Sequence, residues 1–253
     1  MARYRSFLFP EAIVKEGTIV LDRRESHHLV RVFRAKTGET IEVLDGRGTH
    51  YFGHIHSVDA RAVGVSVESV KTVSAVRPHI VLLQSESKAK SMDLVLRMAT
   101  EIGVGAIQPV FTDQGEHQKR KHEKRELVMI EACKQCGLSY LPALHEPCHL
   151  QDWLQSNPLH SNSLRLVASL EDGSQPLLDV LQKTSEPVES VIIAIGPAGD
   201  FTRSEYTCLQ DHGFTAVRLG ANVLRVETAV AYTLSIVDQA VRFPRAHAEE
   251  YRR

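Results

Sequence analysis

Cysteine is scarce in this chain, with four residues in 253. So few cysteines exclude a disulfide framework as the basis of the fold. Cys133 and Cys136 form a CxxC motif, which could become a zinc site only if Cys148 and His149 joined it. A structural zinc site normally has a second clean pair of ligands, and the histidines show no HExxH or similar spacing. We therefore expect two thiols on one helix face and no metal.

Long hydrophobic runs are also missing. No stretch approaches the roughly 20 apolar residues that span a bilayer. The segment Met1–Phe7 carries charge but is not followed by the apolar run of a signal peptide. Hydrophobic residues still make up 43% of the chain, which is enough for a substantial core. The sequence thus predicts a cytoplasmic protein with no membrane partner.

The chain has almost no net charge, −1 at pH 7, but its basic residues are clustered. Residues 1–36 contain eight Arg or Lys against four acids, and residues 117–125 contain five against one. A single basic run is most often a solvated helix face. Two such regions on a neutral protein favour an RNA-binding surface.

Residues 18–70 have the pattern of short β-strands. Hydrophobic and polar residues alternate over 40–44, 51–56 and 62–70, and Asp45–Gly48 has the composition of a turn. Strands at this spacing are typical of a small barrel. One helix is expected near Ser26–Ala35, with Ser26 as its N-cap.

From His79 onward, buried apolar strands alternate with helices, which predicts a parallel sheet in an α/β domain. Ligands of such sheets bind at the carboxyl ends of the strands, so the loops after Ile195 and Leu219 are the places to search. We expect strands at 79–84, 105–110, 164–169, 191–195 and 216–219, and helices at 91–102, 119–136, 176–183, 204–212 and 226–241.

Two loops stand out in this α/β region. Gly196 and Gly199 flank Pro197 directly after a strand, and Thr202 with Glu205 forms a capping box that begins a helix. This loop lacks the spacing of a phosphate-binding loop. The second loop ends in Arg225 and Glu227, which lead into an apolar helix. The pair is either a structural ion pair or part of a ligand pocket.

These segments resemble the SPOUT methyltransferases that modify N3 of a uridine in small-subunit ribosomal RNA (RsmE-type). That family carries a GPEGGF loop followed by LGxxILRxETA, which are similar to residues 196–201 (GPAGDF) and 219–229 (LGANVLRVETA). Residues 99–103 (ATEIG), 131–137 (EACKQCG) and 27–34 (HHLVRVFR) also resemble family segments in the same order.

The resemblance implies a fold and partners. Residues 1–74 would form a PUA-like β-barrel that binds RNA. Residues 75–253 would form a SPOUT α/β domain with a parallel sheet and a deep trefoil knot, a feature that spacing alone never predicts. The family works as a homodimer, methylates 16S ribosomal RNA of the small subunit, and uses S-adenosyl-L-methionine.

The resemblance also implies site residues. Arg225 would stabilise the uracil anion and Glu227 would orient Arg225. The RNA would contact Arg3, Arg5, His28, Arg31 and Arg34, and the four arginines would bind its phosphates. The cofactor would contact Ser169, Leu170, Ile195, Gly196, Pro197, Gly199, Leu219, Gly220, Val223, Leu224 and Thr228.

The chain departs from the family pattern at four positions. Ala198 replaces a glutamate, Asp200 a glycine and Leu138 an arginine, and Gln114 stands where the family has a charged residue. These changes leave two alternatives open. The protein could be a methyltransferase of the same fold with a different RNA target, or an inactive RNA-binding or ribosome-assembly protein.

Overall fold

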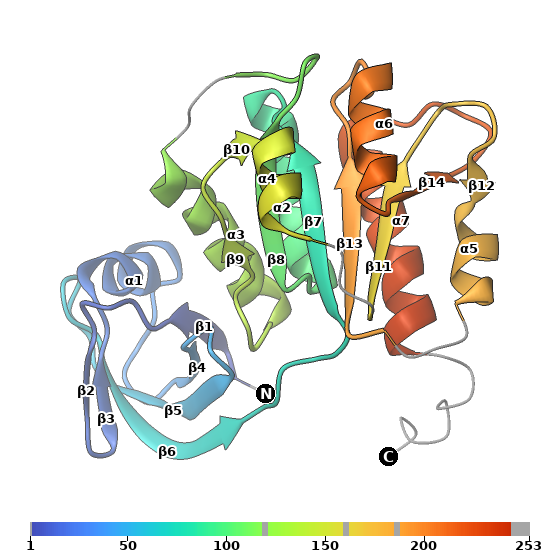
Figure 1. Ribbon diagram of the computed structural model, residues 1–253. Coiled ribbons are helices and arrows are strands. Elements are labelled where there is room, and N and C mark those ends of the chain that lie inside the picture. The colour runs from blue at the N-terminus through green and yellow to red at the C-terminus, as the bar shows by residue number, and fades with distance from the viewer. Residues whose placement is uncertain (1, 118–120, 159–161, 185–187, 244–253) are drawn as a thin grey trace. The chain divides into compact units, whose positions relative to one another are not determined.

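The computed structural model describes residues 2–117, 121–158, 162–184 and 188–243. The chain divides into two compact units (Figure 1). The first comprises residues 1–75 and Ile130–Leu141, and the second comprises Val76–Met129 and Pro142–Arg253. The sequence analysis assigned residues 130–141 to the C-terminal domain, whereas here they pack with the N-terminal strands. The domain boundary after residue 74 stays a prediction.

The first unit is built on one six-stranded sheet that curves around its own core. Its strands run in the order β1-β4-β5-β6-β3-β2, with β1 parallel to β4 and the other neighbours antiparallel. Ile41, Val43, Ile55 and Val65 are fully buried on its inner face. The bounds are β1 Tyr4–Phe7, β2 Ile13–Lys15, β3 Thr18–Val20, β4 Thr40–Leu44, β5 Thr49–Ser57 and β6 Gly64–Thr72.

The helical segment of this unit begins earlier than the sequence suggested. Helix α1 (Arg23–His27) is capped by Asp22, whose carboxylate accepts hydrogen bonds from two backbone amides of the first turn. The prediction of Ser26 as N-cap is wrong: Ser26 is buried, and its hydroxyl donates to Leu21 O and accepts from Val63 N. A π-helical turn, η1 (His28–Val32), continues the segment.

The second unit contains the parallel sheet that the sequence predicted. The strand order is β10-β8-β7-β13-β11-β14-β12, with β9 paired to β8. Strand β13 lies between β7 and β11. The chain therefore adds strands toward one edge of the sheet from β7 and toward the other edge after β13, with the switch point between β7 and β13. The bounds are β7 His79–Ser85, β8 Ala106–Phe111, β9 Ala143–Leu144, β10 Cys148–His149, β11 Ser163–Ala168, β12 Gln175–Pro176, β13 Ser190–Ile195 and β14 Thr215–Arg218.

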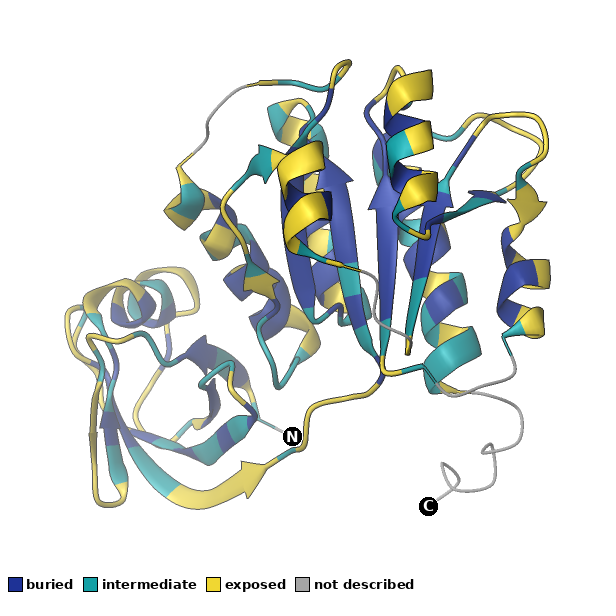
Figure 2. Ribbon diagram, viewed as in Figure 1, coloured by how far each residue is buried: buried dark blue, intermediate teal, exposed yellow. Residues whose placement is uncertain are grey.

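Helices cover both faces of this sheet, and its central strands are the most buried part of the chain (Figure 2). Helices α4 (Leu150–Ser156) and α6 (Arg203–Asp211) pack on one face through Trp153, Leu154 and Leu209. Helices α2 (Ala89–Ile102) and α7 (Val226–Arg242) pack together on the other face, next to α5 (Leu177–Lys183). Alternate strand residues point to opposite faces, which explains the continuous apolar runs.

Helix α3 (His122–Cys136) is shared by the two units: its residues up to Met129 belong to the second and those from Ile130 to the first. None of the helices in the described residues is both long enough and apolar enough to cross a bilayer. The trefoil knot stays a prediction.

Candidate cofactor and substrate site

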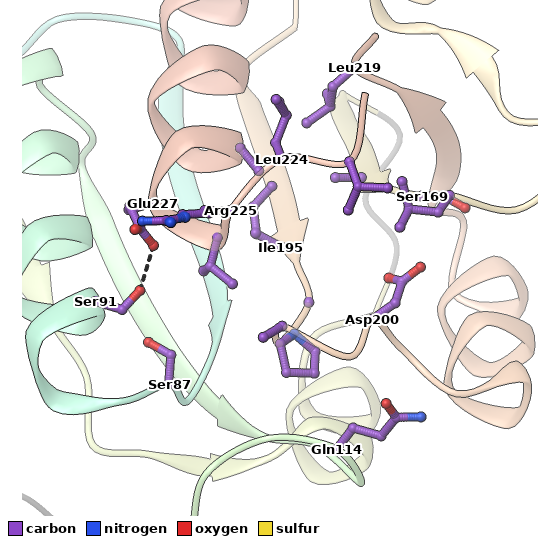
Figure 3. A pocket seen from close by; sticks show the side chains of 18 of the residues that line it. Ser87, Ser91, Gln114, Ser169, Ile195, Asp200, Leu219, Leu224, Arg225 and Glu227 are labelled. Carbon is purple, nitrogen blue, oxygen red and sulfur yellow. Dashed lines mark hydrogen bonds between the residues drawn. The ribbon is translucent and has the colours of Figure 1, made fainter. Parts of the chain in front are cut away.

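A cavity of about 720 Å³ opens at the carboxyl ends of the parallel strands. Its walls come from the loops after β7, β8, β11, β13 and β14 and from the start of α7. Figure 3 shows two sides to it. Ser91, Arg225 and Glu227 lie on one side, and Ser169 and Asp200 on the other. The cavity therefore lies where the chain reverses across the sheet, as expected of ligand sites in open α/β sheets.

Most of the residues predicted to bind the cofactor line this cavity. They are Ser169, Leu170, Ile195, Gly196, Pro197, Leu219, Gly220, Val223 and Leu224. Gly199 and Thr228 do not line it. Gly199 faces the side chain of Gln114, and Thr228 is exposed on the first turn of α7. Three loops distant in sequence thus meet, although binding by these residues stays a prediction.

Sequence reasoning missed the wall formed by the loop after β7. Glu86, Ser87, Lys88 and Ser91 all line the cavity. The sequence could have indicated these residues, because this loop also follows the carboxyl end of a buried strand. It was overlooked because the segment contains no glycine and no distinctive motif.

The predicted nucleoside end of the cavity is apolar and open. Ile195 forms its floor at 2% exposure, whereas Val223 and Leu170 are 76% and 54% exposed at its rim. A Cβ added to Gly220 would meet no atom within 4 Å, so backbone is accessible there. Apolar side chains surrounding free backbone groups suit a flat heterocycle whose polar edge hydrogen-bonds to the main chain.

A buried ion pair fixes the loop after β7. The two terminal guanidinium nitrogens of Arg125, Nη1 and Nη2, donate to the carboxylate of Glu86 at 2.6 and 2.7 Å, and both side chains are almost fully buried. The sequence analysis counted Arg125 in a basic RNA-binding run, and this placement is wrong. Lys119 and Arg120 of the same run lie outside the described residues.

Asp200 adopts the left-handed backbone conformation, with φ of 68°. Its Oδ1 accepts hydrogen bonds from the Tyr206 hydroxyl at 2.7 Å and from the Phe201 amide at 2.9 Å. Burial and the hydrogen bond to Asp200 hold the pKa of Tyr206 well above its usual value. These bonds fix the carboxylate along the wall beside Ser169, so Asp200 lines the cavity, and Ala198 is exposed at its rim.

Substitutions at Asp200 separate backbone strain from hydrogen bonding. Both Asp200→Ala and Asp200→Gly lose the bond from Tyr206, but only glycine removes the penalty of a left-handed conformation. We expect the alanine variant to be less stable than the glycine variant by about 1 kcal/mol in urea denaturation. Equal stabilities would show that the backbone at this position is unstrained.

Arg225 and Glu227 have different surroundings. Glu227 accepts a hydrogen bond from the Ser91 hydroxyl at 2.7 Å, which together with its own backbone amide lowers the pKa of its carboxyl. Arg225 is exposed at the N-cap of α7, and among the described residues its guanidinium has no hydrogen bond or ion pair. The positive charge of Arg225 also lowers the pKa of Glu227, although no hydrogen bond joins the two side chains among the described residues, and an orienting role of Glu227 toward Arg225 stays a prediction.

Two of the predicted RNA-binding residues have partners within the first unit. Arg5 donates to Glu42 at 2.7 Å and to the Gln135 carbonyl at 2.9 Å, and Arg3 pairs with Glu39 at 2.7 Å. Burial would raise the pKa of Glu42, but hydrogen bonds from His50 and Arg5 outweigh it and lower that pKa. Arg3 and Arg5 thus stabilise the first unit, and RNA binding by them stays a prediction.

The other three predicted RNA-binding residues are available for ligands. Arg31 and Arg34 are exposed and His28 is half-buried, all at or beside η1.

Leu138, which stands where the family has an arginine, lies in the segment 130–141 that belongs to the first unit. Its carbonyl accepts a hydrogen bond from the Cys133 thiol. Among the residues that the structure describes, no cluster of three His, Cys, Asp or Glu side chains is close enough to hold a metal.

Comparison with known proteins agrees with this architecture. Residues 75–238 match the model of an RNA methyltransferase domain, and residues 21–68 match an RNA methyltransferase PUA domain. Ribosomal RNA small subunit methyltransferase E of Buchnera aphidicola is 27% identical over 219 residues, covering 83% of each chain. The Synechocystis protein of that name is 27% identical over 237 residues, covering 93% of this chain and 77% of its own.

Solved structures show the same fold. Ribosomal RNA small subunit methyltransferase E of Neisseria gonorrhoeae, bound to S-adenosyl methionine, matches with a TM-score of 0.82 at 26% identity, covering 93% of this chain and 97% of its own. A Legionella pneumophila protein with bound S-adenosylmethionine matches with a TM-score of 0.82 at 28% identity, covering 95% and 98%. The chain therefore belongs to the RNA methyltransferase family that includes ribosomal RNA small subunit methyltransferase E.

Proposed function

We propose that the protein transfers a methyl group from S-adenosyl-L-methionine to N3 of one uridine in 16S ribosomal RNA of the small subunit. The observation that carries this proposal is the cavity, which has an apolar, backbone-lined side and a side with an unpaired guanidinium. The named relatives support the target. Cytoplasmic location, the homodimer and the knot belong to the same proposal.

The cavity fits the cofactor in size and chemistry. A volume of about 720 Å³ is within the range of cofactor sites. Ile195, Leu219 and Leu224 would pack against the adenine, and the backbone near Gly220 would read its edge. When bound, S-adenosylmethionine supplies an electrophilic methyl group on a sulfonium.

Arg225 would hold the reacting base. Uracil N3 carries a proton and becomes a good nucleophile only when that proton leaves. The resulting charge spreads to O2 and O4, where a guanidinium can donate hydrogen bonds. Because Arg225 is exposed and unpaired beside the cavity, it can bind the anion without breaking an existing ion pair.

Glu227 would hold Ser91 in place on the side of the cavity where the uridine binds, and it would not act as the general base. A base works best with a pKa near the working pH, and the pKa of Glu227 lies below its ordinary value. Its carboxylate is therefore ionised at neutral pH and holds Ser91. The N3 proton would leave to solvent as the N3–methyl bond forms and the methyl–sulfur bond breaks.

The pH dependence of the single-turnover rate tests this role. We expect the rate to rise from pH 6 to 9 as N3 loses its proton, with no inflection from Glu227, whose lowered pKa keeps it ionised throughout. Glu227→Gln should lower the rate but keep the shape of the profile. If the rise between pH 6 and 9 disappears in Glu227→Gln, Glu227 is the base.

Calorimetric titration with S-adenosylmethionine tests cofactor binding. We expect micromolar affinity in the native protein and no measurable binding in Leu224→Arg, because the larger charged side chain fills the apolar side of the cavity. Leu178→Arg is the matched control, since Leu178 is 53% exposed on α5. It should bind normally.

The outcomes distinguish the three candidate functions. Binding with methylation of 16S RNA at uridine N3, read by nucleoside mass spectrometry, supports the proposal. Binding with methylation elsewhere indicates a different RNA target. No binding, to the free protein or in the presence of small subunits, indicates an RNA-binding protein without catalysis.

A further inference from the structure

Phe33 is an exposed aromatic residue in a basic surface of the N-terminal unit. It follows η1 directly, and its side chain is 47% exposed. Arg31 and Arg34 are exposed close to it in sequence, and neither guanidinium has an ion pair among the described residues. Scattered exposed aliphatic residues need no explanation, but a large ring between two unpaired arginines suggests a ligand.

The ring of Phe33 is held in a fixed orientation by other rings. It contacts His28 edge-to-face, with centroids 4.8 Å apart, and Tyr4 at 5.6 Å. Tyr4 is itself buried, and its hydroxyl donates to Glu39 at 2.8 Å. The next residue, Arg34, has a φ of 53°, a conformation that residues other than glycine rarely adopt outside functional or tightly packed sites.

The charge around Phe33 is positive. The nearby carboxylate of Glu39 pairs with Arg3 at 2.7 Å and accepts hydrogen bonds from Tyr4 and from the Lys36 amide. The Lys36 amide and then Tyr4 lower the pKa of Glu39. Glu39 is thus neutralised locally, and Arg31, Arg34 and Lys36 remain exposed. A hydrophobic protein partner would favour a less charged surface.

We propose that Phe33 is a stacking platform for an unpaired base of the RNA substrate, with Arg31 and Arg34 contacting the phosphates beside that base. Proteins recognise single-stranded RNA by stacking bases on aromatic rings within a basic groove. The proposal rests on the proposed function, because it takes RNA as the substrate. It adds a single-stranded feature at the N-terminal unit that the target must present.

Binding to a short single-stranded RNA that carries one 2-aminopurine tests the proposal, with the duplex of the same sequence alongside. We expect tighter binding to the single strand and quenching of the 2-aminopurine. Phe33→Ala should weaken single-strand binding about tenfold and abolish the quenching. Phe33→Trp should retain both. The salt dependence should stay unchanged in Phe33→Ala and become shallower in Arg34→Ala, which loses a phosphate contact.

Val32→Ala is the matched control, because Val32 is the adjacent exposed apolar residue, at 60%. Equal affinity and quenching in Phe33→Ala and Val32→Ala would overturn the proposal. Loss of self-association in Phe33→Ala without loss of RNA affinity would also overturn it, in favour of a contact between copies of the chain. Cofactor calorimetry distinguishes failure of this proposal from failure of the proposed function. If the protein binds no cofactor but Phe33→Ala still weakens RNA binding, only the proposed function is contradicted.

Discussion

Arg225→Ala is expected to slow methyl transfer to 16S RNA by about 10²–10³-fold, the effect of removing one donor that stabilises a developing anion. Arg225→Lys should recover little, because an ammonium cannot reproduce the planar donor pair of a guanidinium. Cofactor affinity should change less than twofold, since Arg225 lies on the opposite side of the cavity from Ser169. Single-turnover rates and calorimetry measure the two quantities separately.

Arg218→Ala is the control for this experiment. Arg218 also lines the cavity and is exposed, but it is the last residue of β14 rather than the N-cap of α7, and its guanidinium lies 4.0 Å from the carboxylate of Asp172. We expect Arg218→Ala to retain most of the rate. A proportional loss of cofactor affinity and rate in Arg225→Ala would instead make Arg225 a cofactor ligand.

Lys134→Met is expected to destabilise the N-terminal unit by about 3–5 kcal/mol, the usual cost of leaving a buried charge without its partner. The ammonium of Lys134 lies 2.8 Å from a Glu25 oxygen, and both side chains are nearly inaccessible. Glu25 also accepts from the Ser6 hydroxyl and the Phe7 amide, so its carboxylate cannot turn to solvent. Urea denaturation, with hydrogen exchange in β4 and β5, measures the loss.

The control and a compensating variant keep this prediction specific. Lys71→Met replaces an exposed lysine on β6 and should change stability by less than about 0.5 kcal/mol. Adding Glu25→Gln to Lys134→Met removes the unpaired charge while keeping an acceptor for Phe7, so it should restore part of the stability. If Lys134→Met were as stable as Lys71→Met, the buried ion pair between Lys134 and Glu25 would not stabilise the N-terminal unit, and the prediction would be wrong.

The elements of the parallel sheet were predictable because each has a strong local signal. Strand β13 is a continuous apolar run, and α6 begins with a capping box that the structure reproduces at Thr202 and Glu205. The shortest strands were missed because two or three residues carry too little periodicity. Strand β2 has three residues, and β9 and β10 have two each.

The site was predictable only in part. The loops after β13 and β14 carry motifs, and they meet at one cavity. The hydrogen bond from Ser91 to Glu227 joins residues 136 positions apart, and nothing in the sequence pattern pairs them. In the same way, Arg125 looked like one of several surface cations. Only the tertiary structure shows it paired with Glu86.

The sharing of α3 has a consequence for the order in which the chain folds during synthesis. Domains at the N-terminus generally fold first as they leave the ribosome. Here the first unit lacks Ile130–Leu141, and therefore the cation that neutralises Glu25, until part of the second unit has been made. We expect a nascent chain released at residue 75 to remain open to proteases. Protection should appear only once Leu141 has emerged.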